Sequence, residues 1–141
     1  MGVRSAARFW LPPIVWIAVI FVASTDYFSS ANTAVWLAAT VEAIIHHPLP
    51  PSQFEAIHFI LRKAGHLTEY AILGALLFRA FRGERSGWSG RRSLAAVVLA
   101  ALIGASDEWH QSFVASRTAS AWDALIDTIG AAIAQVLFFR Q

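Results

Sequence analysis

Four long apolar segments, separated by polar stretches, organise the chain. They cover approximately residues 6–24, 62–81, 93–110 and 120–139. A helix needs about 20 residues, at roughly 1.5 Å each, to cross the hydrocarbon of a bilayer. None of the segments supplies 20 consecutive apolar residues, so each predicted span brings polar side chains with it. No stretch alternates with the period of two that is typical of half-buried strands, so the pattern predicts an all-α fold.

A shorter apolar stretch at residues 34–45 follows the first segment and has Glu42 as its one charged residue. Ser30 or Asn32 is a suitable N-cap for a helix here, and the His-His-Pro sequence from His46 is expected to end it. Because the stretch is too short to cross a membrane, we predict an interfacial or re-entrant helix.

A helical pattern then begins near Pro51 and continues to Phe81, with residues 62–81 as its membrane-spanning half. The predicted architecture is a polytopic membrane protein, with a four-transmembrane-helix bundle and an additional interfacial or re-entrant helix after the first span. Its length predicts a single domain, residues 1–141. A signal peptide also starts with basic and then apolar residues, but Trp10 and Trp16 are unusual in a signal core and favour a retained helix.

Composition supports a membrane protein. The chain is 57% hydrophobic and 14% charged, whereas soluble domains carry about a quarter charged residues. The chain has no cysteine, which excludes disulfides and thiolate metal sites. Its basic residues form no patch on a soluble domain, so we expect membrane lipids and no nucleic acid as partners.

The distribution of arginines predicts the orientation, because short basic loops remain cytoplasmic. Four crossings leave most arginines and Glu84 on one side, and the other eight acids with all five histidines on the other. Both termini are therefore predicted to be cytoplasmic. The arginines on that side are Arg4, Arg8, Arg79, Arg82, Arg85, Arg91, Arg92 and Arg140.

Ionisable residues of three predicted spans fall at a similar depth. Counted from the span ends, His66, Asp107 and Asp123 lie within about 7 Å of the outer boundary, and Glu69 and Asp127 lie about 10 Å below it. An ionised side chain that faces lipid costs at least about 2.5–3.5 kcal/mol. We therefore expect these groups to face one another and to line a polar pocket that opens outward.

The spacing of the polar residues leaves several chemistries open. His66 shares a helix face with Glu69 and Tyr70, and Asp107 shares one with His110 and Gln111. Histidines with carboxylates suit a divalent ion such as zinc, or a metal-free acid/base pair beside a cation that holds an anionic headgroup. No dedicated metal-binding spacing is present, so we assign no metal ligands and leave the cofactor unknown.

Structural roles compete with these chemical ones. Ser120 and Asp123 have the spacing of a capping box, so Asp123 could simply cap the last helix. Asp127 could be a structural partner of Arg117 or His66. The face of Asp123 and Asp127 continues into Gly130 and Ala134, which are small enough for another helix to approach closely.

Three motifs together resemble the VanZ-like family of bacterial membrane proteins. They are RKAGHLTEYAILG (residues 62–74), SDEWHQSFVASRTAS (residues 106–120) and WDALIDTIGAAIA (residues 122–134), and STDYFSS (residues 24–30) also fits. The family takes its name from a protein linked to low-level resistance to teicoplanin, a glycopeptide antibiotic that acts on the cell envelope. The resemblance implies a multi-pass protein of the bacterial cytoplasmic membrane, but no particular reaction.

We therefore hypothesise an outward pocket that acts on or binds a cell-envelope component, such as a cell-wall precursor or a lipid headgroup. The alternatives are binding without turnover and a polar network that only holds the helices together; enzymatic activity and oligomeric state remain open. The candidate catalytic residues are His66, Asp107, Glu108, His110 and Asp123. The candidate binding residues are Lys63, Glu69, Tyr70, Gln111, Arg117 and Asp127.

Overall fold

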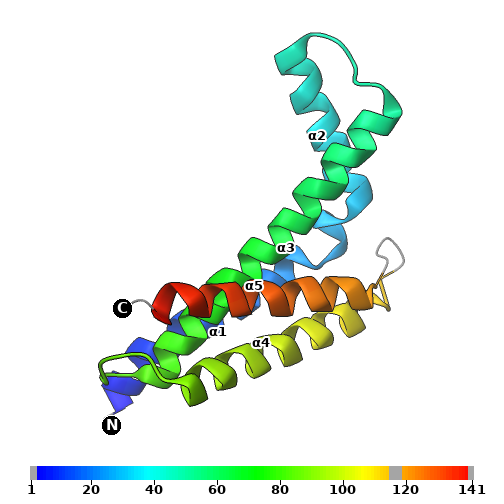
Figure 1. Ribbon diagram of the computed structural model, residues 1–141. Coiled ribbons are helices and arrows are strands. Elements are labelled where there is room, and N and C mark those ends of the chain that lie inside the picture. Colours follow the sequence, from blue (N-terminus) through cyan, green and yellow to red (C-terminus); the bar gives the residue numbers. More distant parts are fainter. Residues whose placement is uncertain (1–2, 115–118, 140–141) are drawn as a thin grey trace.

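The computed structural model describes residues 3–114 and 119–139. Within these residues the chain forms five α-helices and one short 3-10 turn, without strands, which confirms the all-α prediction (Figure 1). The elements in chain order are α1 (Val3–Ala23), η1 (Asp26–Phe28), α2 (Ser30–Ile45), α3 (Pro51–Arg82), α4 (Gly90–Gln111) and α5 (Ala121–Phe139).

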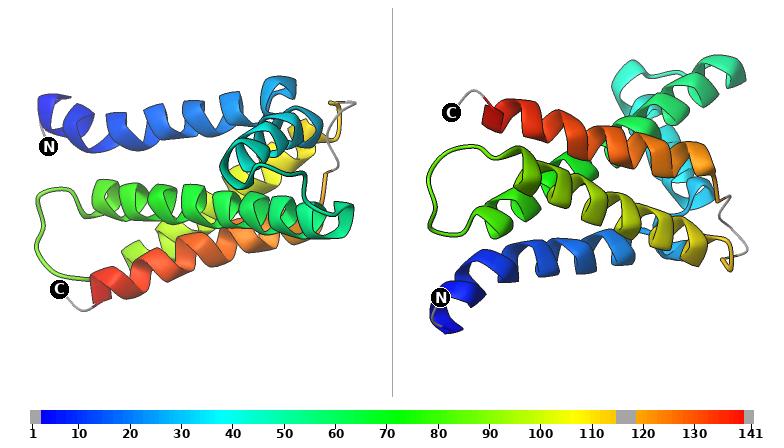
Figure 2. Two further views of the ribbon diagram at one scale, coloured as in Figure 1. Left: turned by 90° about the horizontal axis from the view of Figure 1, so that it is seen from above. Right: turned by 60° about the horizontal axis from the view of Figure 1, so that its bottom comes forward.

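The second half of α3 packs with α4 and α5, and α1 lies along α3 (Figure 2). The buried core comes mainly from α3, whose Leu73, Leu77 and Phe78 are fully enclosed. α4 contributes Ala96 and Ala100 to the same core, where the small side chains let the helices lie close together. The apolar side chains of these helices thus pack into the core of a helical bundle.

The pairing of α3 with α5 depends on small residues. A Cβ added at Gly74 would lie 2.7 Å from the Cα atom of Ala131, and one added at Gly130 would collide with the carbonyl oxygen of Leu67. Ala134, one turn after Gly130, is buried. The predicted close approach along this face of α5 is therefore confirmed.

Both chain ends and the α3–α4 turn lie at one end of the bundle (Figure 2). Near the start of α1, the hydroxyl of Ser5 donates a hydrogen bond to Glu84 in that turn over 2.7 Å. The ring of Trp88, in the same turn, packs edge-on against Phe139 at the end of α5. The helices therefore run up and down between this end and the opposite one, where α1 and α4 finish and α5 begins.

α2 and the first half of α3 extend away from the bundle (Figure 1). α3 has 32 residues, or about 48 Å at 1.5 Å per residue, so it is longer than the bundle helices. α2 is longer than the predicted stretch 34–45, and its N-cap is Ser29, whose hydroxyl accepts from the backbone N–H of Asn32. The prediction of Ser30 or Asn32 as the cap was therefore wrong. The helix ends at Ile45, and the backbone of its C-cap residue, His46, has the left-handed conformation.

Large apolar side chains cover much of the outer surface of the bundle, among them Leu94, Leu102 and Leu137, each more than 60% exposed. Among the described residues, one helical segment, Ser5–Ala23, is long and apolar enough to cross a membrane by length and composition. The four-span arrangement itself stays a prediction.

The substitution Gly130→Ala tests the α3–α5 contact. The new methyl group would meet the Leu67 carbonyl, which belongs to a rigid helix backbone. We expect it to lower stability by about 1–3 kcal/mol, as overpacking does, measured by thermal unfolding in detergent. Gly65→Ala is the matched control, because a Cβ there meets nothing within 4 Å. Equal stability of the two variants would contradict the proposed contact.

Candidate functional site

Polar side chains from four helices converge at the end of the bundle opposite the chain termini. We call this group the polar cluster. Asp107, Asp123 and Asp127 are at most 1% exposed within it. Its members are Ser24 at the end of α1; Arg62, Lys63, His66 and Tyr70 on α3; Asp107, Glu108 and Gln111 on α4; and Asp123 and Asp127 on α5.

His66 and Asp127 form the central pair of the polar cluster. The Nδ1 atom of His66 lies 3.1 Å from Oδ1 of Asp127, across the α3–α5 interface. Asp127 is completely buried, whereas the His66 side chain is 12% exposed. The carboxylate therefore lies behind the imidazole and orients it, leaving Nε2 as the ring nitrogen available to another group.

Asp123 is held by two cations from α3. Lys63 Nζ forms an ion pair with Oδ1 of Asp123, and Arg62 donates to Oδ2 over 3.4 Å. The Asp123 carboxylate thus links α5 to α3 through two ion pairs. Lys63, one of the candidate binding residues, forms this ion pair within the protein.

Asp107 connects α4 to the end of α1. Its Oδ2 accepts hydrogen bonds from the Ser24 hydroxyl over 2.6 Å and from the Gln111 amide over 2.9 Å. Gln111 lies one turn after Asp107 and also approaches the Ser24 hydroxyl at 3.4 Å. This three-residue group fastens α1, which otherwise contacts mainly α3.

Glu108 caps the start of α5. Its Oε2 accepts a hydrogen bond from the backbone N–H of Ser120 over 2.7 Å. In a capping box this N–H would bond to the acid three residues later, but the carboxylate of Asp123 bonds to Lys63 and Arg62. Glu108 therefore fills the place that the sequence pattern assigned to Asp123.

Several buried polar atoms of the polar cluster have no hydrogen-bond partner among the described residues. They are the Tyr70 hydroxyl, Oδ1 of Asp107, Oε1 of Glu108 and Oδ2 of Asp127. An unsatisfied polar group costs about 1–3 kcal/mol when it is buried, and most such atoms in proteins have partners. Three buried carboxylate oxygens in this state within one cluster are therefore unusual.

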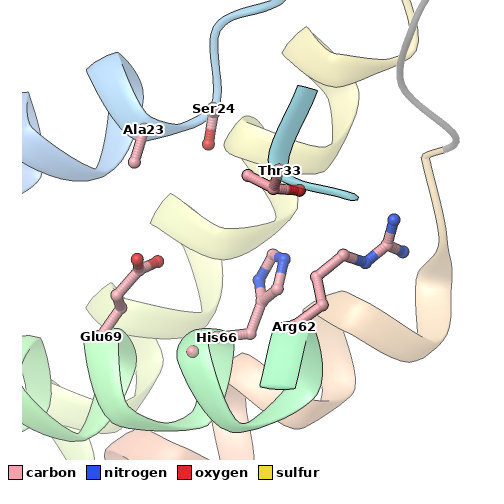
Figure 3. A pocket seen from close by; sticks show the side chains of 7 residues that line it. Ala23, Ser24, Thr33, Arg62, His66 and Glu69 are labelled. Atoms are coloured by element: carbon pink, nitrogen blue, oxygen red, sulfur yellow. The ribbon is translucent and has the colours of Figure 1, made fainter. Parts of the chain in front are cut away.

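A cavity of about 210 Å³ adjoins the polar cluster. Arg62, His66 and Glu69 line it from one face of α3, and Ala23, Ser24 and Thr33 lie across from them (Figure 3). A second cavity of about 240 Å³ shares Arg62 and Thr33 and continues between α2 and α3 toward Leu37 and His58. The two cavities thus adjoin each other, from the contact between α2 and the first half of α3 to the polar cluster.

The structure does not bring all the predicted residues together. His110 is exposed, and its ring packs edge-on near Phe21 at the rim of the bundle, outside the cluster. Arg117 lies outside the described residues. Glu69 lines the cavity, and Tyr70 is fully buried.

Sequence reasoning missed Ser24 and Thr33 and assigned Arg62 no role. Arg62 lies four residues before His66, so the helical period was a signal for its place beside that histidine. Ser24 and Thr33 carry no such signal, because helix packing alone brings the α1 end and α2 over α3.

Three residues of the polar cluster could share a metal ion. Each of His66, Glu108 and Asp127 offers one ligand atom, and the three atoms lie within 4.8 Å of one another. They come from three different helices, so the grouping could not be read from sequence spacing.

These features define a class: an all-helical protein with a polar cluster buried at one end of a bundle whose outer surface is strongly apolar. A family model described as VanZ/LLP1 matches residues 9–140, nearly the whole chain, and the protein belongs to this family. Family membership together with the apolar helix α1 favours a membrane protein. Comparison with curated proteins and with solved structures finds no match.

The substitution Lys63→Met tests the tie between α3 and α5. It leaves the buried carboxylate of Asp123 with Arg62 alone. We expect a loss of roughly 3 kcal/mol, because an uncompensated buried charge remains, measured by thermal unfolding in detergent. The double variant Lys63→Met/Asp123→Leu should recover part of it. A double variant less stable than the sum of its single changes would refute the pairing.

Proposed function

We propose that the protein crosses the bacterial cytoplasmic membrane four times, through α1, the second half of α3, α4 and α5. The arrangement of the chain ends supports this, because the termini and the α3–α4 turn share one end. Arg82, Arg85 and Arg91 also lie at or near that turn, as expected for a cytoplasmic side. The polar cluster then lies near the outer face, where the exposed Trp109 and Trp122 suit the membrane interface.

Cysteine labelling tests this topology, since the chain has no cysteine of its own. Ser86→Cys in the α3–α4 turn and Ser52→Cys at the start of α3 are both exposed positions. In intact spheroplasts, a membrane-impermeant maleimide should label Ser52→Cys and reach Ser86→Cys only after lysis. Equal labelling of both before lysis would exclude the topology.

The proposed activity is binding of the polar end of an amphiphilic cell-envelope component in the cavity beside His66. The observation that carries it is the cavity itself: Arg62, His66 and Glu69 line one wall of it, directly in front of the buried Asp127. A pocket with few, convergent polar groups beside apolar walls suits such a ligand. Its acyl or prenyl chain would lie along the apolar outer surface of the bundle.

The lining residues suggest how the ligand is held. Arg62 is placed to hold an anionic group such as a phosphate, and Glu69 to accept hydrogen bonds from hydroxyl or amino groups. His66, oriented by Asp127, could exchange a proton with the ligand through Nε2, so acid/base chemistry on a headgroup is an extension of this proposal. A link to glycopeptide resistance follows from it only if the component is a cell-wall precursor.

A purely structural role is the second candidate. Lys63 and Asp123 bond to each other across α3 and α5, and Asp107 and Gln111 of α4 bond to Ser24 at the end of α1, as that role requires. It also covers the bonds of Arg62 to Asp123 and of His66 to Asp127, but it gives no account of the cavity that these two residues line. The polar cluster therefore combines bonds between helices with side chains that also line the cavity.

Lipid co-purification tests the binding proposal. Arg62→Gln and His66→Gln should each reduce bound envelope lipid by about tenfold, because a lost charged hydrogen bond costs about 1.5–3 kcal/mol. Native mass spectrometry of protein released from nanodiscs measures it. Arg91→Gln, an exposed arginine at the other end of α4, is the matched control. Unchanged lipid in both cavity variants, with all three proteins folded, would leave the structural role as the better account.

A further inference from the structure

We propose that His66, Glu108 and Asp127 form a binding site for one divalent transition-metal ion, of the kind represented by Zn²⁺ or Mn²⁺. The ligands come from α3, α4 and α5, so the ion would lie where the three helices meet. The site deepens the proposed function: its part in ligand binding rests on that function, whereas the metal site itself does not.

The distances between the three ligand atoms are close to those around a single ion. The Nδ1 atom of His66 and Oδ1 of Asp127 are 3.1 Å apart. Two neighbouring ligands, each about 2.0–2.2 Å from one ion, are separated by about 3.0–3.6 Å. An ion could therefore replace the shared proton with little movement of either side chain. Glu108 completes the group within 4.8 Å, and a shift of its flexible side chain by about 1 Å would close the triangle.

Two carboxylate oxygens of the group lack a hydrogen-bond donor among the described residues. Oε1 of Glu108 and Oδ2 of Asp127 are buried and have no hydrogen-bond partner among the described residues. Both side chains are more than nine-tenths buried. A Cβ added at Gly104 of α4 would lie 3.2 Å from Oδ2 of Asp127, so this oxygen points toward α4, one turn from Glu108. Oδ2 of Asp127 thus faces the helix that carries Glu108, the third member of the group.

The positive charges near the site are fewer than its carboxylates. The described ion pairs place Arg62 and Lys63 on Asp123 and His66 on Asp127, whereas Glu108 and Asp107 receive neutral donors: the Ser120 N–H, the Ser24 hydroxyl and the Gln111 amide. Buried carboxylates require compensating positive charge. An ion of charge +2 would provide it at the centre of the polar cluster.

The ligand set indicates the class of ion. One imidazole with two carboxylates suits Zn²⁺, Mn²⁺ or Fe²⁺ better than Mg²⁺ or Ca²⁺, which prefer oxygen alone. The ion would lie at Nδ1, behind the imidazole ring, where Asp127 now bonds, and would hold the ring with Nε2 available to the cavity. An anionic headgroup in the cavity would then contact Nε2 and Arg62, and the ion would act on it through the imidazole.

Elemental analysis tests the site directly. The wild-type protein, purified without a histidine tag, should hold about one Zn²⁺ or Mn²⁺ per chain, measured by inductively coupled plasma mass spectrometry. After treatment with chelator, adding back Zn²⁺ or Mn²⁺ alone should raise the melting temperature. His66→Gln, Glu108→Gln and Asp127→Asn should each weaken metal affinity by more than about 100-fold, the upper end of what loss of an outer partner costs.

His47→Gln and Glu55→Gln are the matched controls, because both residues are exposed and lie outside the polar cluster. They should retain the metal. Wild-type protein that holds no ion and shows no thermal shift with Zn²⁺ or Mn²⁺ would overturn the site, whatever the variants do. So would equal metal content in the ligand variants and the controls. Arg62-dependent lipid binding by a metal-free protein would leave the proposed function standing and refute only the metal.

Discussion

The arrangement of this bundle depends on the need to pair carboxylates that lie where water is scarce. Asp107, Asp123 and Asp127 are almost completely buried, and a lone ionised group in such surroundings would cost several kcal/mol. Each has a partner outside its own helix. Asp107 of α4 bonds to Ser24 at the end of α1, whereas Asp123 and Asp127 of α5 bond to Lys63 and His66 of α3. These pairings fix which faces of the helices meet. The apolar core below them supplies stability without dictating that register.

Close helix packing makes this pairing possible. Glycines at Gly74 and Gly130 let α5 lie against the backbone of α3, which brings Asp123 and Asp127 within reach of side chains on α3. The same packing separates two kinds of polar group. Those between α3, α4 and α5 hold the helices together, whereas Arg62, His66 and Glu69 line the cavity beside α2. Arg62 and His66 belong to both sets, because Arg62 also bonds to Asp123 and His66 to Asp127. His66 contacts the fully buried Asp127 on one side and the cavity on the other. It is therefore the residue through which ligand, proton or metal chemistry would act.

Helical periodicity and the cost of burying charge were enough to predict the helices and the meeting of His66, Asp107, Asp123 and Asp127 at one level. Sequence could not assign their partners. His110 shares a nominal face with Asp107, yet a small difference in rotation about α4 leaves it exposed. The carboxylate of Glu108 caps α5 by accepting from the backbone N–H of Ser120. The local spacing of Ser120 and Asp123 had favoured Asp123 for that role. The sequence predicted a polar pocket but not its opposite wall, since Ser24 and Thr33 reach the cavity through tertiary packing alone.

Cross-linking in native membranes tests most directly whether the helices meet through their polar groups. The chain has no cysteine, so Ser24→Cys and Gln111→Cys can be introduced together at the junction of α1 and α4. The amide of Gln111 and the hydroxyl of Ser24 are 3.4 Å apart. A short bifunctional thiol cross-linker should join the two cysteines within one chain, because a cysteine at position 111 is shorter than the glutamine it replaces and leaves a gap for the linker to span, while Ser24→Cys with Ser86→Cys, at opposite ends of the bundle, should remain unlinked. Failure of the first pair to cross-link in folded protein, or equal cross-linking of both pairs, would contradict the convergence of the helices on this cluster.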